Sequence, residues 1–138
     1  MKKLLIPSIF FVLLISFSFA QKPYKVVFYN LENFFDTIND PEVLDDEFTP
    51  DGPKKWNTAK YNKKLNNTER VLFDIAAIDK NYPIVIGVSE VETRGVLEDI
   101  VATPKLAPAN YRIAHFDSPE ARGVDVACLL YTSPSPRD

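Results

Sequence analysis

Residues 84–92 read IVIGVSEVE, an apolar run that passes directly into two glutamates. The run 83–88 (PIVIGV) has no alternation of apolar and polar residues, which predicts a short strand covered on both faces. Ser89 and Glu90 therefore stand at the carboxyl end of this strand. Ligands of open α/β sheets bind outside the carboxyl ends of strands, so Glu90 is a candidate site residue.

A second strand is predicted upstream, at residues 24–30 (YKVVFYN), which are rich in β-branched and aromatic side chains. Asn30 stands at the end of this strand, as Glu90 does at the end of the other. We therefore expect the two side chains to face one cleft. From position alone an alternative stays open, in which Asn30 is a turn former and Glu90 a solvated acid.

The other segments complete an α/β pattern. The chain has 138 residues, which allows one domain at most. Its predicted elements are a long acidic surface loop at 37–56, an amphipathic helix at 58–79, a short helix at 93–101, and strands at 111–116 and 124–127. The order strand, helix, strand, helix, strand, strand is typical of an α/β protein.

Charge and cysteine content exclude some classes of function. The formal net charge is -3, and loss of Lys2 and Lys3 with a leader makes it -5, which is not the basic balance of a protein held to nucleic acid by many phosphate contacts. A metal ion can still supply positive charge at a phosphodiester. The single Cys128 forms no intramolecular disulfide, and a lone cysteine with a lone histidine far away in sequence gives no reason to propose a thiol enzyme.

The first 20 residues are predicted to be a secretory signal peptide. Lys2 and Lys3 precede an apolar run that ends in small residues at Ala20. The run is shorter than the roughly 20 apolar residues of a spanning helix and contains a proline, which argues against a membrane anchor. Gln21 follows the cleavage point, and the absence of cysteine there argues against a lipoprotein. We expect a secreted or periplasmic protein without a stable membrane anchor.

Residues 128–138 (CLLYTSPSPRD) differ in character from what precedes them. They resemble one translated frame of a sequencing adapter, which predicts that the natural sequence ends near Ala127 and that the tail is not native. The alternative is a genuine proline-rich linker. Natural codons that continue into a long open frame would contradict the adapter origin.

Three blocks of the sequence resemble, in order, the first three conserved blocks of the endonuclease/exonuclease/phosphatase superfamily. They are residues 26–36 (VVFYNLENFFD), 84–92 (IVIGVSEVE) and 117–127 (DSPEARGVDVA). The resemblance implies an α/β fold of four layers, with two packed sheets flanked by helices. Residues 21–127 would then be the first half of that domain.

The resemblance also assigns roles to individual residues. Asn30 matches the family asparagine that helps to orient the scissile phosphate, and Glu90 matches the glutamate that binds Mg²⁺ or Mn²⁺. Many relatives carry glutamine before this glutamate, where this chain has Ser89. Arg122 is a candidate phosphate ligand, with a solvated turn arginine as the alternative. His115 does not match the catalytic histidine of the family.

The implied function is metal-dependent, endonuclease-like hydrolysis of nucleic acid or another phosphodiester, with no protein partner. The other catalytic groups of the family belong to the second half of the domain, so residues 21–127 alone are expected to be inactive. Alternatives are a phosphatase or phospholipase of the same superfamily, or an exported binding module that has lost catalysis, because one fold hosts all of these.

Overall fold

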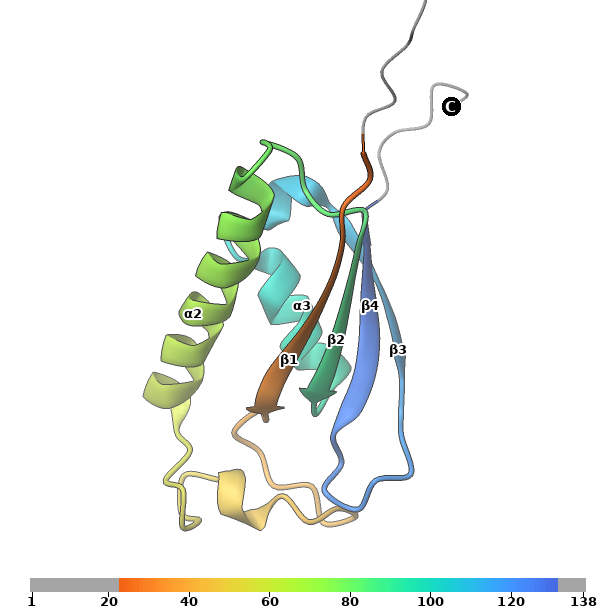
Figure 1. Ribbon diagram of the computed structural model, residues 1–138. Coiled ribbons are helices and arrows are strands. Elements are labelled where there is room, and N and C mark those ends of the chain that lie inside the picture. The colour runs from red at the N-terminus through yellow and green to blue at the C-terminus, as the bar shows by residue number, and fades with distance from the viewer. Residues whose placement is uncertain (1–22, 132–138) are drawn as a thin grey trace, which may run out of the picture.

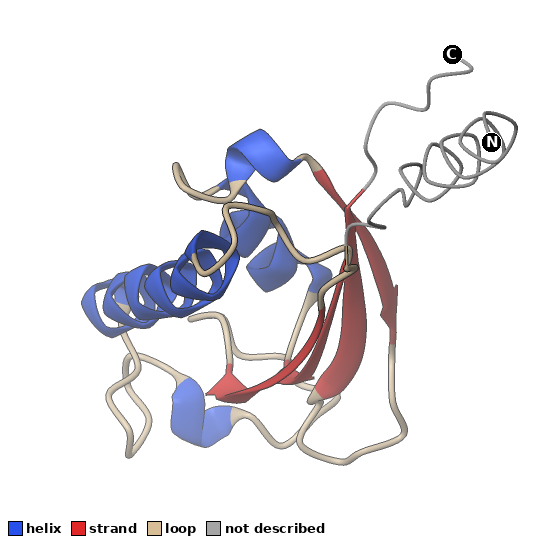
Figure 2. Cartoon of the chain, turned by 45° about the horizontal axis from the view of Figure 1, so that its top comes forward, coloured by secondary structure: helices blue, strands red, loops and turns tan. Residues whose placement is uncertain are grey.

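The computed structural model describes residues 23–131 as a four-stranded sheet with both helices on one of its faces (Figures 1 and 2). The elements are β1 (Val26–Phe34), the 3-10 turn η1 (Asp46–Phe48), α2 (Thr58–Ala77), β2 (Val85–Val91), α3 (Arg94–Ala102), η2 (Ala107–Ala109), β3 (Tyr111–Phe116) and β4 (Asp125–Tyr131). The prediction of a mixed α/β chain is confirmed. The predicted signal peptide and residues 132–138 lie outside the described residues.

The sheet is mixed, with strand order β1-β2-β4-β3. Strands β1 and β2 are parallel and are joined by the crossover helix α2, as parallel neighbours require. Strand β4 runs antiparallel to both β2 and β3. The carboxyl ends of β1 and β2 therefore meet at one edge, at the lower end of the sheet in Figure 1. In the part of the chain that the structure describes, no helix has the length and apolarity needed to cross a membrane.

The hydrophobic core lies between the sheet and the helices. The side chain of Asn57 caps α2 by accepting from the backbone N–H groups of residues 59 and 60, and Thr93 caps α3 by accepting from that of residue 96. Both helices then turn their apolar stripes toward the sheet. The core side chains include Phe34, Leu72, Ile86, Val88, Val91, Leu97, Ile100 and Leu129, all at most 1% exposed.

The opposite face of the sheet is apolar and is not covered by any described residue (Figure 2). Five large apolar side chains on it are exposed, by fractions between 37% and 74%: Val26, Phe28, Phe116, Val126 and Leu130. Gly87 lies beneath the ring of Phe28. A β-carbon at position 87 would come within 2.9 Å of Cδ2 of this ring, which leaves room for glycine only. In the described residues the strand at 83–88 is covered on one face only, and its coverage on both faces stays a prediction, since an apolar run does not reveal what packs on it.

Strand β4 extends past the predicted end of its segment. The sequence predicts a strand that stops at Ala127, whereas the observed strand continues for four residues to Tyr131. Leu129 is fully buried and pairs with Ile86 on one side and Ile113 on the other. The first residues of the predicted tail thus contribute to the core, because alternate side chains of this apolar run face the helices. The adapter origin of residues 128–138 stays a prediction.

The loop between β1 and α2 is held against the lower end of the sheet. The indole of Trp56 donates to the carbonyl of Phe35 at 3.0 Å, and the Phe35 ring stacks on Phe48 with centroids 4.1 Å apart. The backbone N–H of Leu44 donates to the carbonyl of Ala121 at 2.8 Å, which joins this loop to the β3–β4 connection. Both loops are consequently fixed beside the strand ends.

Candidate active site

Regular pairing between β1 and β2 stops at the same level as the pairing between β2 and β4. Asn30 pairs with Ser89, after which the register shifts on both sides of β2. Glu90 follows with a left-handed backbone, φ +59°, and has no partner in either ladder. A side chain released in this way is redirected out of the pleat, as β-bulges near functional sites commonly do.

The structure brings together the two polar residues predicted from the strand ends. Nδ2 of Asn30 donates to Oε1 of Glu90 at 3.0 Å, and the backbone N–H of Asn33 donates to Oε2 of Glu90 at 3.0 Å. Asn33 also has a left-handed φ, of +59°, which turns its N–H toward the carboxylate. The carboxylate is thus held by donors from β1 at both oxygens.

Arg122 reaches the same place from the β3–β4 connection. Its Nη1 donates to Oδ1 of Asn33 at 2.9 Å and its Nε donates to Oε1 of Glu120 at 2.9 Å. The hydrogen bond to Glu120 raises the pKa of Arg122, and the charge of Glu90 adds to the rise. The guanidinium therefore lies near Glu90 with one terminal nitrogen not engaged by these bonds.

A second cation, Lys64 of α2, also lies near Glu90. Its Nζ donates to the carbonyl of Glu32 at 2.6 Å and to that of Asn33 at 3.3 Å. Burial lowers the pKa of Lys64, while the charges of Glu32 and Glu90 oppose the shift. A cavity of about 400 Å³ adjoins it and is lined by residues that include Asn30, Glu32, Lys60, Lys63 and Lys64. Positive charge thus flanks the carboxylate from two elements.

A family model described as the Endonuclease/Exonuclease/phosphatase family matches residues 25–135. The chain belongs to the endonuclease/exonuclease/phosphatase family. Members of this family are generally hydrolases of phosphodiesters or phosphate esters, and they typically use divalent metals. No curated protein and no solved structure matches the chain. The match continues past Ala127. It includes the residues that meet at the ends of β1 and β2, namely Asn30, Asn33, Lys64, Glu90 and Arg122.

The residues present fit the divalent ion that the family implies. Each carboxylate oxygen of Glu90 accepts one hydrogen bond and keeps a further lone pair, and the side chain is only partly buried, so water reaches it. Mg²⁺ and Mn²⁺ take such oxygen donors, and Mg²⁺ commonly uses one or two carboxylates with several waters. Glu90 is the residue of this cluster that would hold the ion.

Asn33 and Lys64 were missed by sequence reasoning. Asn33 lies in a strand-like segment three residues after Asn30, where nothing predicts its left-handed turn. Lys64 is one of several lysines in an amphipathic helix, and the sequence does not distinguish it from its solvated neighbours. Asn33 is contacted by Lys64, which is 31 residues away in the sequence, and by Arg122, which is 89 residues away. Only tertiary packing shows contacts of this kind.

Glu92, two residues after Glu90, and Asp45 form a pair of buried acids. Glu92 is 8% exposed and accepts from the backbone N–H of Asp36 at 2.6 Å. Burial, together with the nearby carboxylates of Asp36 and Asp45, raises the pKa of Glu92 to about 8. Oδ1 of Asp45 is buried and accepts no other hydrogen bond from the described residues. A proton on Glu92 gives this oxygen a hydrogen-bond donor.

We therefore expect stability of the metal-free protein to fall as pH rises from about 4.5 to about 8. In this window the unfolded chain releases the Glu92 proton and the folded chain keeps it, at a cost of roughly 1.4 kcal/mol for each pH unit in the limit. Glu92→Gln should flatten this dependence. The measurement is the urea midpoint in EDTA, followed by fluorescence of Trp56, the only tryptophan. A pH dependence that the substitution leaves unchanged would contradict the shift.

Proposed function

We propose that this protein is a divalent-metal-dependent phosphodiesterase of the endonuclease type. The observation that carries the proposal is the hydrogen bond from Asn30 to Glu90 at the joined ends of β1 and β2, with Arg122 and Lys64 close by. One carboxylate, one amide and two cations suit a phosphodiester group bound beside a hard cation. The family match supports hydrolysis of a phosphate ester in general.

The roles follow from the contacts. Glu90 would hold Mg²⁺ or Mn²⁺, which when bound supplies positive charge to the oxygens of the phosphate. Asn30 holds the Glu90 carboxylate in one orientation and presents its amide to the same region. Arg122 would donate to a nonbridging phosphate oxygen with the nitrogen that Glu120 and Asn33 do not use. These donors are fixed before substrate arrives, which is the condition for electrostatic stabilisation of developing charge.

We further propose that a second sheet packs on the uncovered face, which would complete the four-layer sandwich. The exposed side chains Phe28, on β1, and Val126 and Leu130, on β4, lie on the two strands that flank β2 and face the same side of the sheet. Apolar patches of this kind mark surfaces that are covered in the working protein. In this proposal the second sheet comes from the second half of the family domain, together with the groups that activate water.

The test is hydrolysis by a longer chain that includes the second half of the family domain. We expect Mg²⁺ or Mn²⁺ to support cleavage of bis(p-nitrophenyl) phosphate and of DNA, EDTA to abolish it, and the 138-residue chain to be inactive. Preference for p-nitrophenyl phosphate, a monoester, would favour the phosphatase alternative instead. Absence of hydrolysis of any phosphate ester by the longer chain would favour the non-catalytic binding module.

We also propose that the protein acts outside the cytoplasm, after cleavage near Ala20. The support is the order of Lys2, Lys3, the apolar run and the small residues that end at Ala20. Mass measurement of the exported protein tests this, with Gln21 expected as the first residue. A mature protein that retains Met1 would contradict it.

A further inference from the structure

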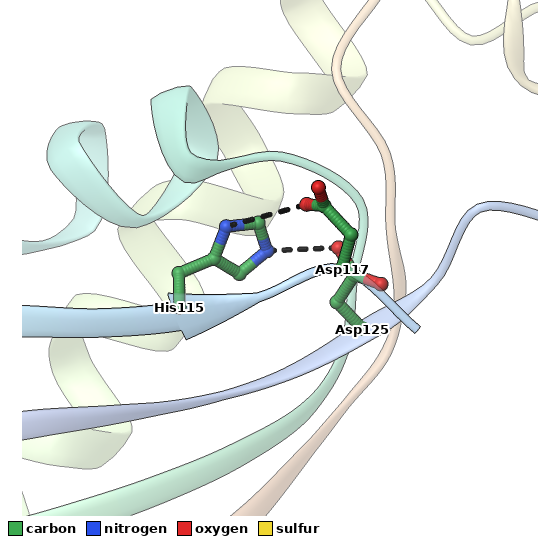
Figure 3. Close-up of side chains that lie close together, drawn as sticks. All are labelled: His115, Asp117 and Asp125. Atoms are coloured by element: carbon green, nitrogen blue, oxygen red, sulfur yellow. Dashed lines mark hydrogen bonds and ion pairs between the residues drawn. The ribbon is translucent and has the colours of Figure 1, made fainter. Parts of the chain in front are cut away.

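His115 lies beside two aspartates, Asp117 and Asp125, at the end of β3 (Figure 3). Its Nε2 is 2.8 Å from Oδ2 of Asp125, a residue that is 5% exposed. The other carboxylate oxygen of Asp125 accepts from the backbone N–H of Ser118 at 2.7 Å. The buried carboxylate thus accepts the Nε2 proton and fixes the ring, which assigns the lone pair of a neutral imidazole to Nδ1.

The other ring nitrogen, Nδ1, is left without a hydrogen bond among the described residues, and Asp117 lies beside the ring on the same side as Asp125 (Figure 3). The His115 side chain is 8% exposed, and Nδ1 has no hydrogen-bond partner in residues 23–131. The nearest carboxylate oxygen, Oδ1 of Asp117, is 4.0 Å away, beyond the range of a hydrogen bond. Two ligand atoms of one tetrahedral zinc-like ion lie roughly 3.4 Å apart. The Asp117 side chain is 95% exposed, so a small rotation of it would bring the two atoms to that separation.

The surroundings of this gap are acidic. A cavity of about 560 Å³ opens beside it and is lined by Glu92, Glu120 and Asp40 as well as the three residues of Figure 3. The basic side chain in this lining, Arg94, is paired with Glu98 at 2.9 Å. Glu92 keeps its proton to about pH 8 and Glu120 is paired with Arg122, so the negative field that a cation in the cavity would meet comes from Asp40, Asp117 and Asp125.

We propose that His115 Nδ1 and Asp117 form a binding site for a divalent transition metal of the zinc class, with water as the other ligands. Asp125 is not a ligand in this site but holds the imidazole through Nε2. A histidine ligand whose second ring nitrogen donates to a carboxylate is the usual arrangement in protein metal sites. Mixed nitrogen and oxygen donors favour zinc-class ions over Mg²⁺, which prefers oxygen alone.

This site is separate from the cluster around Glu90. His115 pairs with Ala127, on the helix-covered side of the sheet, whereas Asn30 pairs through Ser89 with Val126, on the uncovered side. Metal binding would fix the ends of the turn from Asp117 to Asp125. That turn carries Arg122, so the ion would stabilise the placement of the guanidinium without touching it.

The direct test is zinc binding by the full chain in a Cys128→Ser, Glu90→Gln background, which removes the thiol and the other carboxylate site. We expect equilibrium dialysis to show one Zn²⁺ per chain. X-ray absorption at the zinc edge should show scattering from one imidazole. Because His115 is the only histidine in the chain, that signature identifies the ligand without ambiguity.

Asp117 offers the sharpest variant because its side chain is 95% exposed and its loss should not disturb the fold. Asp117→Asn is expected to weaken Zn²⁺ binding by about tenfold or more, since the loss of even an outer-shell partner of a metal ligand costs roughly 10–100-fold in affinity. Asp74→Asn, the same change at an exposed acid on α2, should leave binding unchanged. A bound zinc without imidazole scattering, no bound zinc, or equal affinity in the Asp117→Asn variant would overturn the site.

Discussion

Glu90→Gln is expected to lower metal-dependent phosphodiester hydrolysis by at least about 100-fold in kcat/KM, because removal of a single group that stabilises transition-state charge has costs of this order. The amide has nearly the shape of the carboxylate and still accepts from Asn30, but it carries no charge for a hard cation. The measurement is hydrolysis of bis(p-nitrophenyl) phosphate by the longer chain across a Mg²⁺ series.

The matched control is Glu42→Gln, which makes the same chemical change at an exposed acid of the long loop. Its activity and Mg²⁺ dependence should equal those of the unaltered protein. Circular dichroism of both variants should match the parent, which would show that the loss at Glu90 is chemical. Full activity of Glu90→Gln at low Mg²⁺ would show that the ion is held elsewhere.

The chain of residues 21–138 is expected to self-associate rather than remain a soluble monomer. The uncovered face exposes Phe28 by 73% and Val126 by 56%, on strands that are near neighbours in the sheet. At roughly 25 cal/mol per Å² of apolar surface, covering such a face contributes several kcal/mol toward association. Strand β1 is also an edge strand, and unpaired edges promote pairing with another chain.

Light scattering across a concentration series measures this association. Phe28→Ser together with Val126→Ser should shift the chain toward monomer. Ile38→Ser is the control, because Ile38 is 74% exposed but lies in the loop after β1. A soluble monomer with a sharp, concentration-independent melt would show that residues 21–138 form an independent domain and that the uncovered face needs no second sheet.

The local elements of this protein follow from its sequence. Helical spacing of apolar residues predicted α2 and α3 within two residues of their observed bounds, and β-branched and aromatic runs predicted all four strands. The reason is that side-chain period and capping residues act over a few neighbours, as at Asn57 and Thr93. The closeness of Asn30 and Glu90 was also predicted, because parallel strands joined by one helix end at the same edge.

Strand extents and coverage were decided by the tertiary structure. Leu129 and its neighbours extend β4 because they find partners on β2 and β3, contacts that no local pattern contains. Whether the run at 83–88 is covered on one face or two depends on what packs against the sheet, and the apolar pattern is the same in both cases.

The sequence by itself determined the α/β order and the two residues at the strand ends, since both are properties of short segments. Only the tertiary structure decided the placement of Arg122 and Lys64, and the pairing of His115 with Asp125. These contacts depend on left-handed backbone turns and on loops that meet across the sheet, which propensity does not encode. Charged side chains that are ordinary in the sequence become a site only when packing brings them together and sets the distances between them.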